Sequence, residues 1–164
     1  MVSASFTALG LAATILSTSI VSAQNNQVMQ VIWSSGHFST ISGPTGNEHG
    51  HSNGFAVTDG DGVELYSESY PGDYSPCMTG DGRSFTLTST CWSRERKFKC
   101  VCNLGGNPES CEVRDSGDNV LSSAEGNTET NFIGIAIAQE GACGTSFLLE
   151  ADEHCDDQAE WTVS

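Results

Sequence analysis

The chain has 164 residues, of which 21 are acidic, six are basic and seven are cysteines, and its formal net charge is −15 at pH 7. A charge of this sign and size repels phosphate backbones and anionic headgroups, which argues against nucleic acid and an anionic membrane surface as partners. The length suits one domain with a moderate hydrophobic core.

The first 23 residues have the pattern of a cleavable secretion signal. They contain no charged side chain, carry an apolar stretch from Phe6 to Leu16, and end on the small residues Val21-Ser22-Ala23. The apolar stretch is shorter than the roughly 20 residues that span a bilayer. We therefore expect a signal peptide at 1–23 and one secreted, extracellular β domain at 24–164, with no membrane segment.

The first predicted strand of the mature chain lies at 27–34, where Met29, Val31 and Trp33 share one face. Two histidines follow in the run Glu48-His49-Gly50-His51. In an extended strand both imidazoles would share a face, a geometry suited to Cu²⁺ or Zn²⁺, and His37 or His154 could complete the site.

The residues around this histidine run favour a different interpretation. Glycine, serine, asparagine and proline surround it, and they are typical of a flexible loop with two solvated histidines. Ordering such a loop around an ion would cost conformational entropy. The sequence alone leaves open whether His49 and His51 bind metal, and we predict no metal site and no cofactor.

A hairpin is predicted next, from strands at 54–57 and 63–69. They flank Asp59-Gly60-Asp61-Gly62, whose glycines suit a tight turn. The acidic run lacks the further ligands of a calcium loop. Three tyrosines lie in and after this hairpin, Tyr66, Tyr70 and Tyr74. Exposed rings could anchor a partner or stack on a sugar, but we expect core packing, because aromatic residues usually supply buried area first.

Four of the six basic residues lie between Cys91 and Cys100. The predicted strand at 84–92 places Trp92 on its more polar face, beside this basic cluster, and a strand at 97–103 turns Phe98 toward the core. The candidate binding residues are therefore Trp92, Arg94, Arg96, Lys97 and Lys99. The simpler interpretation is that the basic cluster and the acidic C-terminal segment are two solvated faces.

The strongest remaining strand pattern lies at 131–139, where three isoleucines alternate with mostly small residues. Shorter strands are predicted at 145–150 and 161–163. Turn-forming residues recur at 105–107, 116–119, 125–127 and 140–141. Several short strands separated by turns predict an all-β fold, an antiparallel β-sandwich or β-barrel stabilised by disulfides.

All the cysteines follow the signal, so an oxidising compartment and disulfides are expected. They are Cys77, Cys91, Cys100, Cys102, Cys111, Cys143 and Cys155. Cys100 and Cys102 share one strand face, so each should bridge to a different partner. Proximity in sequence suggests Cys143–Cys155 and Cys77–Cys91, although spacing does not fix the connectivity. The odd count leaves one thiol free, or available for a disulfide-linked homodimer.

No set of catalytic residues with defined roles stands out. The chain has no Gly-x-Ser-x-Gly elbow, and its acids are too numerous to single out a pair for glycoside hydrolysis. The sequence therefore predicts a protein without catalytic activity that acts by binding.

In its signal, size, acidity and β pattern the chain resembles the small secreted cysteine-rich proteins of filamentous fungi, many of them plant-cell effectors or elicitors and some of them allergens. Across 28–69 it is similar to the Alternaria major-allergen family. The Trp33 strand, Phe38, Asn53-Gly54-Phe55 and the Asp61-Gly62 hairpin leading to Leu65 carry that similarity.

The allergen family implies a β-barrel that dimerises through a disulfide, is secreted, and is perceived by plants or the immune system. It supplies no catalytic residues to carry across. The family places its intermolecular bridge near the N-terminus, where this chain has no cysteine before Cys77. We expect an effector or elicitor-like protein that binds a host or other extracellular protein, with a cell-wall carbohydrate-binding or hydrolytic protein as the alternative.

Overall fold

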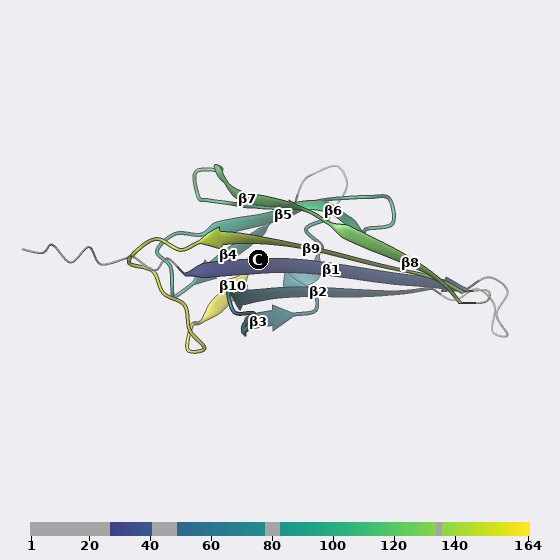
Figure 1. Cartoon of the computed structure of the whole chain (residues 1–164), viewed down its shortest axis with the longest axis horizontal. Coiled ribbons are helices and arrows are strands. Elements are labelled where there is room, and N and C mark those ends of the chain that lie inside the picture. The colour runs from purple at the N-terminus through teal and green to yellow at the C-terminus, as the bar shows by residue number, and fades with distance from the viewer. Residues whose placement is uncertain (1–26, 41–48, 78–82, 134–135) are drawn as a thin grey trace, which may run out of the picture.

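A computed structural model describes residues 27–40, 49–77, 83–133 and 136–164. The predicted signal peptide therefore lies outside the described residues. The strands form two five-stranded antiparallel sheets that pack face to face (Figure 1). The predicted all-β fold is confirmed, and of the two predicted architectures it is the sandwich. No helix in the described ranges has the length and apolar character needed to cross a membrane.

The first sheet has the strand order β3-β2-β1-β9-β8. Its strands are β1 (Val28–Thr40), β2 (His49–Asp59), β3 (Glu64–Glu68), β8 (Asn127–Ile133) and β9 (Ala136–Leu148). The central strand β1 pairs with β2 on one side and with β9 along its whole length on the other. This pairing makes the first sheet the longer layer of the sandwich (Figure 1).

The predicted hairpin is confirmed by the antiparallel pairing of β2 with β3. Its turn is held by Asp59, whose carboxylate Oδ1 accepts hydrogen bonds from the backbone N–H groups of Asp61 and Val63, both at 2.9 Å. Gly62 has a φ of +84°, which favours glycine. The acidic run therefore forms a turn, in which the Asp59 carboxylate is hydrogen-bonded to backbone N–H groups.

The second sheet has the strand order β10-β4-β5-β6-β7. Its strands are β4 (Phe85–Ser89), β5 (Arg96–Cys102), β6 (Pro108–Arg114), β7 (Val120–Glu125) and β10 (Trp161–Val163), and a short 3₁₀ turn, η1, lies at Pro71–Asp73. The sequence predicts turns on both sides of β6 and β7 but neither strand. Both were missed because their outward faces are polar; in β6, Cys111 and Val113 alternate inward among polar residues.

The predicted single strand at 131–139 is wrong. These residues are divided between β8 and β9, which pair antiparallel with Ile133 opposite Ala136, while positions 134 and 135 lie outside the described residues. β9 then runs straight through the turn predicted at 140–141. Gly141 lies on the inner face, where a Cβ atom would come within 2.9 Å of the Cβ of Asn107. That glycine allows close packing rather than a turn.

The hydrophobic core lies between the sheets and is centred on four aromatic rings, those of Trp33, Phe55, Phe85 and Phe98, each at most 1% exposed. The Phe55 ring centroid lies 5.1 Å from that of Phe85 and 5.7 Å from that of Phe98. Tyr66 and Tyr74 pack against this cluster, as expected for rings that cap a small core, whereas Tyr70 is 39% exposed.

Gly126 is the single residue between β7 of the second sheet and β8 of the first, so the chain changes sheets there. Its N–H donates to the Glu109 carbonyl at 2.8 Å. A Cβ atom at this position would overlap the Pro108 carbonyl oxygen and lie 2.8 Å from the Pro108 carbonyl carbon. Only glycine lets the two backbones approach this closely.

Gly126→Ala is therefore expected to destabilise the fold by about 3 kcal/mol, because an added methyl group meets rigid backbone rather than a movable side chain. Chemical denaturation of the purified variant measures the loss. Gly117→Ala, at an exposed turn where the nearest atoms to a new Cβ belong to flexible side chains, is the control and should cost less than about 1 kcal/mol. Equal losses of stability in the two variants would contradict the explanation that Gly126 is required where the chain passes from one sheet to the other.

Three disulfides join Cys77 to Cys102, Cys91 to Cys155, and Cys100 to Cys111. Cys100 and Cys102 bridge to different partners, as predicted. The suggested pairs Cys143–Cys155 and Cys77–Cys91 are wrong, because strand pairing rather than sequence proximity brings the sulfurs together. Cys100 and Cys111, for example, are direct register partners on β5 and β6.

The odd cysteine is Cys143, which is free and only 2% exposed. Its Sγ donates to the Ala124 carbonyl oxygen at 3.5 Å, and burial raises the pKa of the thiol. A buried, protonated thiol is a poor nucleophile. A disulfide-linked homodimer through this residue would require β9 to separate from β7 first.

Candidate functional site

The structure does not gather the five candidate binding residues on one exposed surface. Trp92 is buried at 6% exposure, and its ring lies 5.0 Å from that of Trp161 and 5.8 Å from that of Phe147. The prediction that Trp92 lies on a polar strand face is therefore wrong. The reason is that β4 ends at Ser89 and the following turn directs the ring into the core.

The four basic residues of this cluster are also dispersed. Arg96 is 3% exposed, whereas Arg94 lies in the exposed turn before β5. The Lys97 ammonium is 3.1 Å from the Asp118 carboxylate, and the Lys99 ammonium is 4.0 Å from that of Glu112. The positive charges are thus largely matched by acids of the same chain, which leaves little net attraction for an outside partner.

Arg96 and Glu153 form a buried ion pair with 3.2 Å between Nη2 and Oε2, and each side chain is 4% exposed. The Glu153 carboxylate also accepts hydrogen bonds from the backbone N–H groups of Ser93 and Glu150. Burial alone would raise the pKa of Glu153, but these hydrogen bonds and the Arg96 charge outweigh it and hold the pKa below its ordinary value. The ion pair is structural rather than a binding surface.

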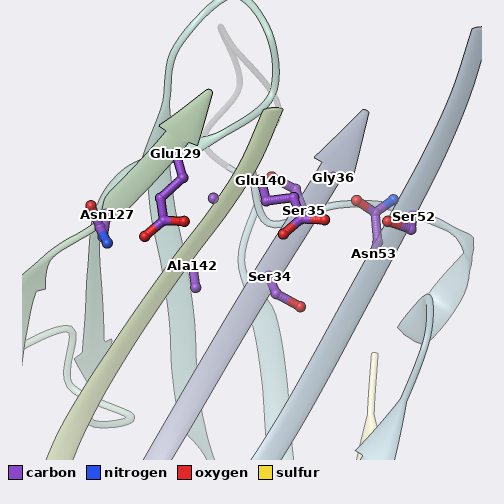
Figure 2. A pocket seen from close by; sticks show the side chains of 10 residues that line it. Ser34, Ser35, Gly36, Ser52, Asn53, Asn127, Glu129, Glu140 and Ala142 are labelled. Atoms are coloured by element: carbon purple, nitrogen blue, oxygen red, sulfur yellow. The ribbon is translucent and has the colours of Figure 1, made fainter. Parts of the chain in front are cut away.

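The face of the first sheet that is turned away from the second sheet, the outer face, carries a groove of about 480 Å³ (Figure 2). Residues of β1, β2, β8 and β9 line it: Ser34, Ser35, Gly36, Ser52, Asn53, Asn127, Glu129, Glu140, Gly141 and Ala142. We call it the outer groove. A second hollow of about 320 Å³ shares Ser34 and extends toward β3.

The floor of the outer groove is a row of register partners, Ser34 on β1, Ala142 on β9 and Asn127 on β8, of which the first two have little side-chain volume. Gly54, the partner of Ser34 on β2, continues the row into the second hollow. A Cβ atom on Gly54 would lie 2.8 Å from the Ser34 hydroxyl oxygen, which donates to the Gly54 carbonyl at 3.3 Å. The absence of side-chain volume along this row is what hollows the sheet face.

Two glutamates stand beside this floor. Glu129 on β8 and Glu140 on β9 are direct register partners, and Figure 2 shows their side chains on either side of the β9 ribbon, with that of Glu140 toward Ser35. Both are exposed, and among the described residues no cation forms an ion pair with either. Like charges directly opposite each other destabilise a sheet. The groove therefore combines open space with unneutralised negative charge.

The sequence analysis did not single out Glu129 and Glu140. The two glutamates face each other because β8 pairs with β9. The sequence analysis predicted one continuous strand at 131–139, so this pairing was not expected. The signal that could have revealed this pairing is the glycine at position 134 of the sequence, because glycine in the middle of a strand pattern can indicate that the pattern belongs to two strands rather than one. Among the side chains that the structure describes, no group of three His, Cys, Asp or Glu residues could hold a metal ion.

Comparison with known proteins adds no functional assignment. No protein-family model matches the chain, and no curated protein or solved structure matches it significantly. The functional argument therefore depends on the geometry of the outer groove.

Proposed function

We propose that this chain is a secreted, non-catalytic protein of the effector or elicitor kind, which binds a basic segment of an extracellular protein in its outer groove. The observation that carries the proposal is the cross-strand pair of Glu129 and Glu140 beside a floor of small residues. A cationic side chain bound between the two carboxylates would relieve their mutual repulsion.

The shape of the groove suits an extended chain. Its floor crosses the four strands at one level, and Ser34, Ser52 and Asn127 supply hydroxyl and amide groups along it. Such groups donate to and accept from a peptide backbone. The net charge of −15 would also speed the encounter with a basic partner.

The composition of the groove favours binding over covalent catalysis. In the described part of the chain its lining contains neither a histidine to activate one of its serines nor a cysteine to act as a nucleophile. The one free thiol, Cys143, is buried on the opposite face of β9.

The alternative function, a cell-wall carbohydrate-binding or hydrolytic protein, is favoured by two features of the same site. Hydroxyl, amide and carboxylate groups are also the ones that bind sugar hydroxyls. Paired carboxylates are in addition the machinery of glycoside hydrolysis, and Glu129 with Glu140 provides such a pair. Among the residues that the structure describes, no aromatic ring on which a sugar could stack lines the groove, which is why we place this function second.

The mature protein is expected to lose elicitor potency when the groove is altered. With the oxidative burst of plant leaf tissue as the readout, E129Q/E140Q should need at least a tenfold higher concentration for a half-maximal response, because it removes both carboxylates. Ala142→Leu should do the same by filling the floor without changing charge. The matched control is E95Q/E160Q, which removes two exposed acids outside the groove and should respond like wild type.

Three results would count against the proposal. Full potency of both groove variants would remove the groove from the function. Equal loss in E95Q/E160Q would indicate a non-specific effect of charge. Co-sedimentation of the wild-type protein with insoluble chitin, β-glucan or cellulose, abolished by E129Q/E140Q, would support the carbohydrate-binding alternative, and release of soluble sugars by the wild type alone would identify a hydrolase.

A further inference from the structure

The second hollow on the outer face continues the outer groove toward the edge strand β3. Both hollows are lined by Ser34 of the central strand β1, and the second is also lined by Gly54, Ala56 and Ser67. Ser34 pairs with Gly54, and Ala56 pairs with Ser67 on β3. In the described part of the chain, no lysine or arginine lines either hollow. The two hollows therefore form one path across the outer face, from β8 to β3, along which no positive charge is present among these residues.

The start of β2 differs from the sequence expectation. A flexible loop was predicted around His49 and His51, whereas both belong to β2 and pair with β1. Ser52, which lines the outer groove, therefore has a defined register, and rows of paired residues can be followed across the sheet.

Glu64 places a further carboxylate at the β3 end of this path. The residue is exposed, and it lines the second hollow. The Ser67 hydroxyl donates to Glu64 Oε1 at 2.6 Å, which holds the carboxylate on the outer face beside Ala56. Among the described residues no cation forms an ion pair with it. The carboxylate of Glu68 is different, because it accepts the hydroxyl of Tyr66, whose ring packs against the core.

The strand register gives the separation of the two acidic ends. Glu140 on β9 is level with Ser52 on β2, whereas Ser67 is level with Ala56, four residues further along β2. Three strand spacings of about 4.8 Å and four residues of about 3.3 Å thus separate Glu140 from the Glu64 carboxylate. The resulting distance is about 20 Å, which an extended chain covers in about six residues.

We propose that the segment bound in the outer groove is bipartite, with a second basic residue about six positions from the one that binds between Glu129 and Glu140. Residues an even number of positions apart share one face of an extended chain, so both basic side chains point toward the sheet. The second one binds Glu64, and the residues between them lie over Ser34 and Gly54. This inference rests on the proposed function, which itself requires only the first basic residue.

Charge complementarity and linkage favour this occupant. A single exposed ion pair contributes little to affinity, but two linked basic groups gain more, because binding of the first makes binding of the second intramolecular. A second copy of the chain is a poor occupant. Its net charge is −15, and both of its lysines are held two positions apart in β5.

The test is titration of the untagged, oxidised mature protein into fluorescently labelled peptides of glycine and serine that carry two lysines, with fluorescence anisotropy as the readout. The peptide with lysines six positions apart should bind about tenfold more tightly than the peptide of identical composition with lysines two positions apart. Glu64→Lys should weaken the six-position peptide about tenfold, and a peptide in which one lysine is replaced by glutamate should recover binding to this variant.

The matched control is Glu95→Lys, which reverses an exposed charge outside both hollows and should keep the affinity for the six-position peptide within about twofold of wild type. Glu64→Gln is the substitute if Glu64→Lys fails to fold, and it should weaken the same peptide about threefold.

The outcomes separate this inference from the proposed function. Binding that is weakened by E129Q/E140Q but unchanged in Glu64→Lys would overturn the bipartite segment and leave the proposed function standing. Equal affinity for the two lysine spacings, no recovery in the charge-swapped combination, or an equal loss in Glu95→Lys would also overturn the bipartite segment alone. Absence of saturable binding of either peptide, or binding unaffected by E129Q/E140Q, would overturn both.

Discussion

Replacing Cys91 and Cys155 together with alanine is expected to lower the free energy of unfolding by about 4 kcal/mol, the largest loss among the three disulfides. A disulfide stabilises a fold by restricting the unfolded chain, and the effect grows with the length of the closed loop. The three bridges span sequence separations of 64, 25 and 11 residues. The loop-entropy relation gives about 4.3, 3.5 and 2.8 kcal/mol in that order.

The Cys91–Cys155 bridge also has a particular structural task. It ties the C-terminal segment, which supplies Glu153 and β10, to the turn after β4. Guanidinium denaturation of the three double-alanine variants measures the order of the losses. A larger loss on removing Cys100–Cys111 would contradict the entropic ranking, because that bridge joins strands already paired in register.

Thiol labelling of the wild-type protein tests the cysteine assignment. Alkylation of the native wild-type protein should label no thiol, and alkylation after unfolding should label Cys143 alone, since it is the one buried free cysteine. A dimer mass that disappears on reduction would show that Cys143 becomes accessible to a second chain, and would favour the covalent dimer that the allergen resemblance implies.

The sequence predicted those features of the fold that local patterns encode. The core face of β5 follows from the alternation of Phe98, Cys100 and Cys102, and the β2–β3 hairpin follows from its glycine-containing turn. In both cases the signal is contained in a few consecutive residues. Short stretches of sequence determine which face of a strand is apolar and where a turn lies, which is why these two features could be predicted.

Features that depend on distant pairing could not be predicted. The disulfide partners, the burial of Trp92 and the pairing of Glu129 with Glu140 each require knowledge of which strands become neighbours. Gly126 shows the same limit. Its sequence neighbours suggest an ordinary turn, whereas the chain changes sheets there, and only the close approach of the Pro108 backbone explains why the residue is glycine. The outer groove arises from four strands in register, and no single stretch of sequence contains it.

Removing one partner of the buried ion pair is the second large effect. Glu153→Ala is expected to cost about 3–5 kcal/mol, because it leaves Arg96 buried with an uncompensated charge. The variant also removes the acceptor of the Ser93 and Glu150 backbone N–H groups. Asp118→Asn is the matched control, since it breaks the exposed pair with Lys97 and should cost less than about 1 kcal/mol.

A double variant separates the cost of the lone charge from the value of the pair. Replacing Arg96 with Met and Glu153 with Leu removes both charges together, and most of the stability lost in Glu153→Ala should return, because no buried charge is left unpaired. Urea denaturation of the wild type, Glu153→Ala, Asp118→Asn and the double variant measures these differences in stability. A double variant less stable than Glu153→Ala would show that the hydrogen bonds of the carboxylate, rather than its charge, dominate.

The pH dependence of stability provides an independent test of this ion pair. The pKa of Glu153 in the folded chain lies below its ordinary value of 4.5, so the unfolded chain binds a proton at Glu153 more readily than the folded chain does. The stabilisation is therefore fully present above about pH 4.5 and is lost as the pH falls through the folded pKa. The stability difference between wild type and Glu153→Gln should shrink on acidification from pH 7 to pH 3. A difference that stays constant over this range would show that Glu153 does not titrate with the fold.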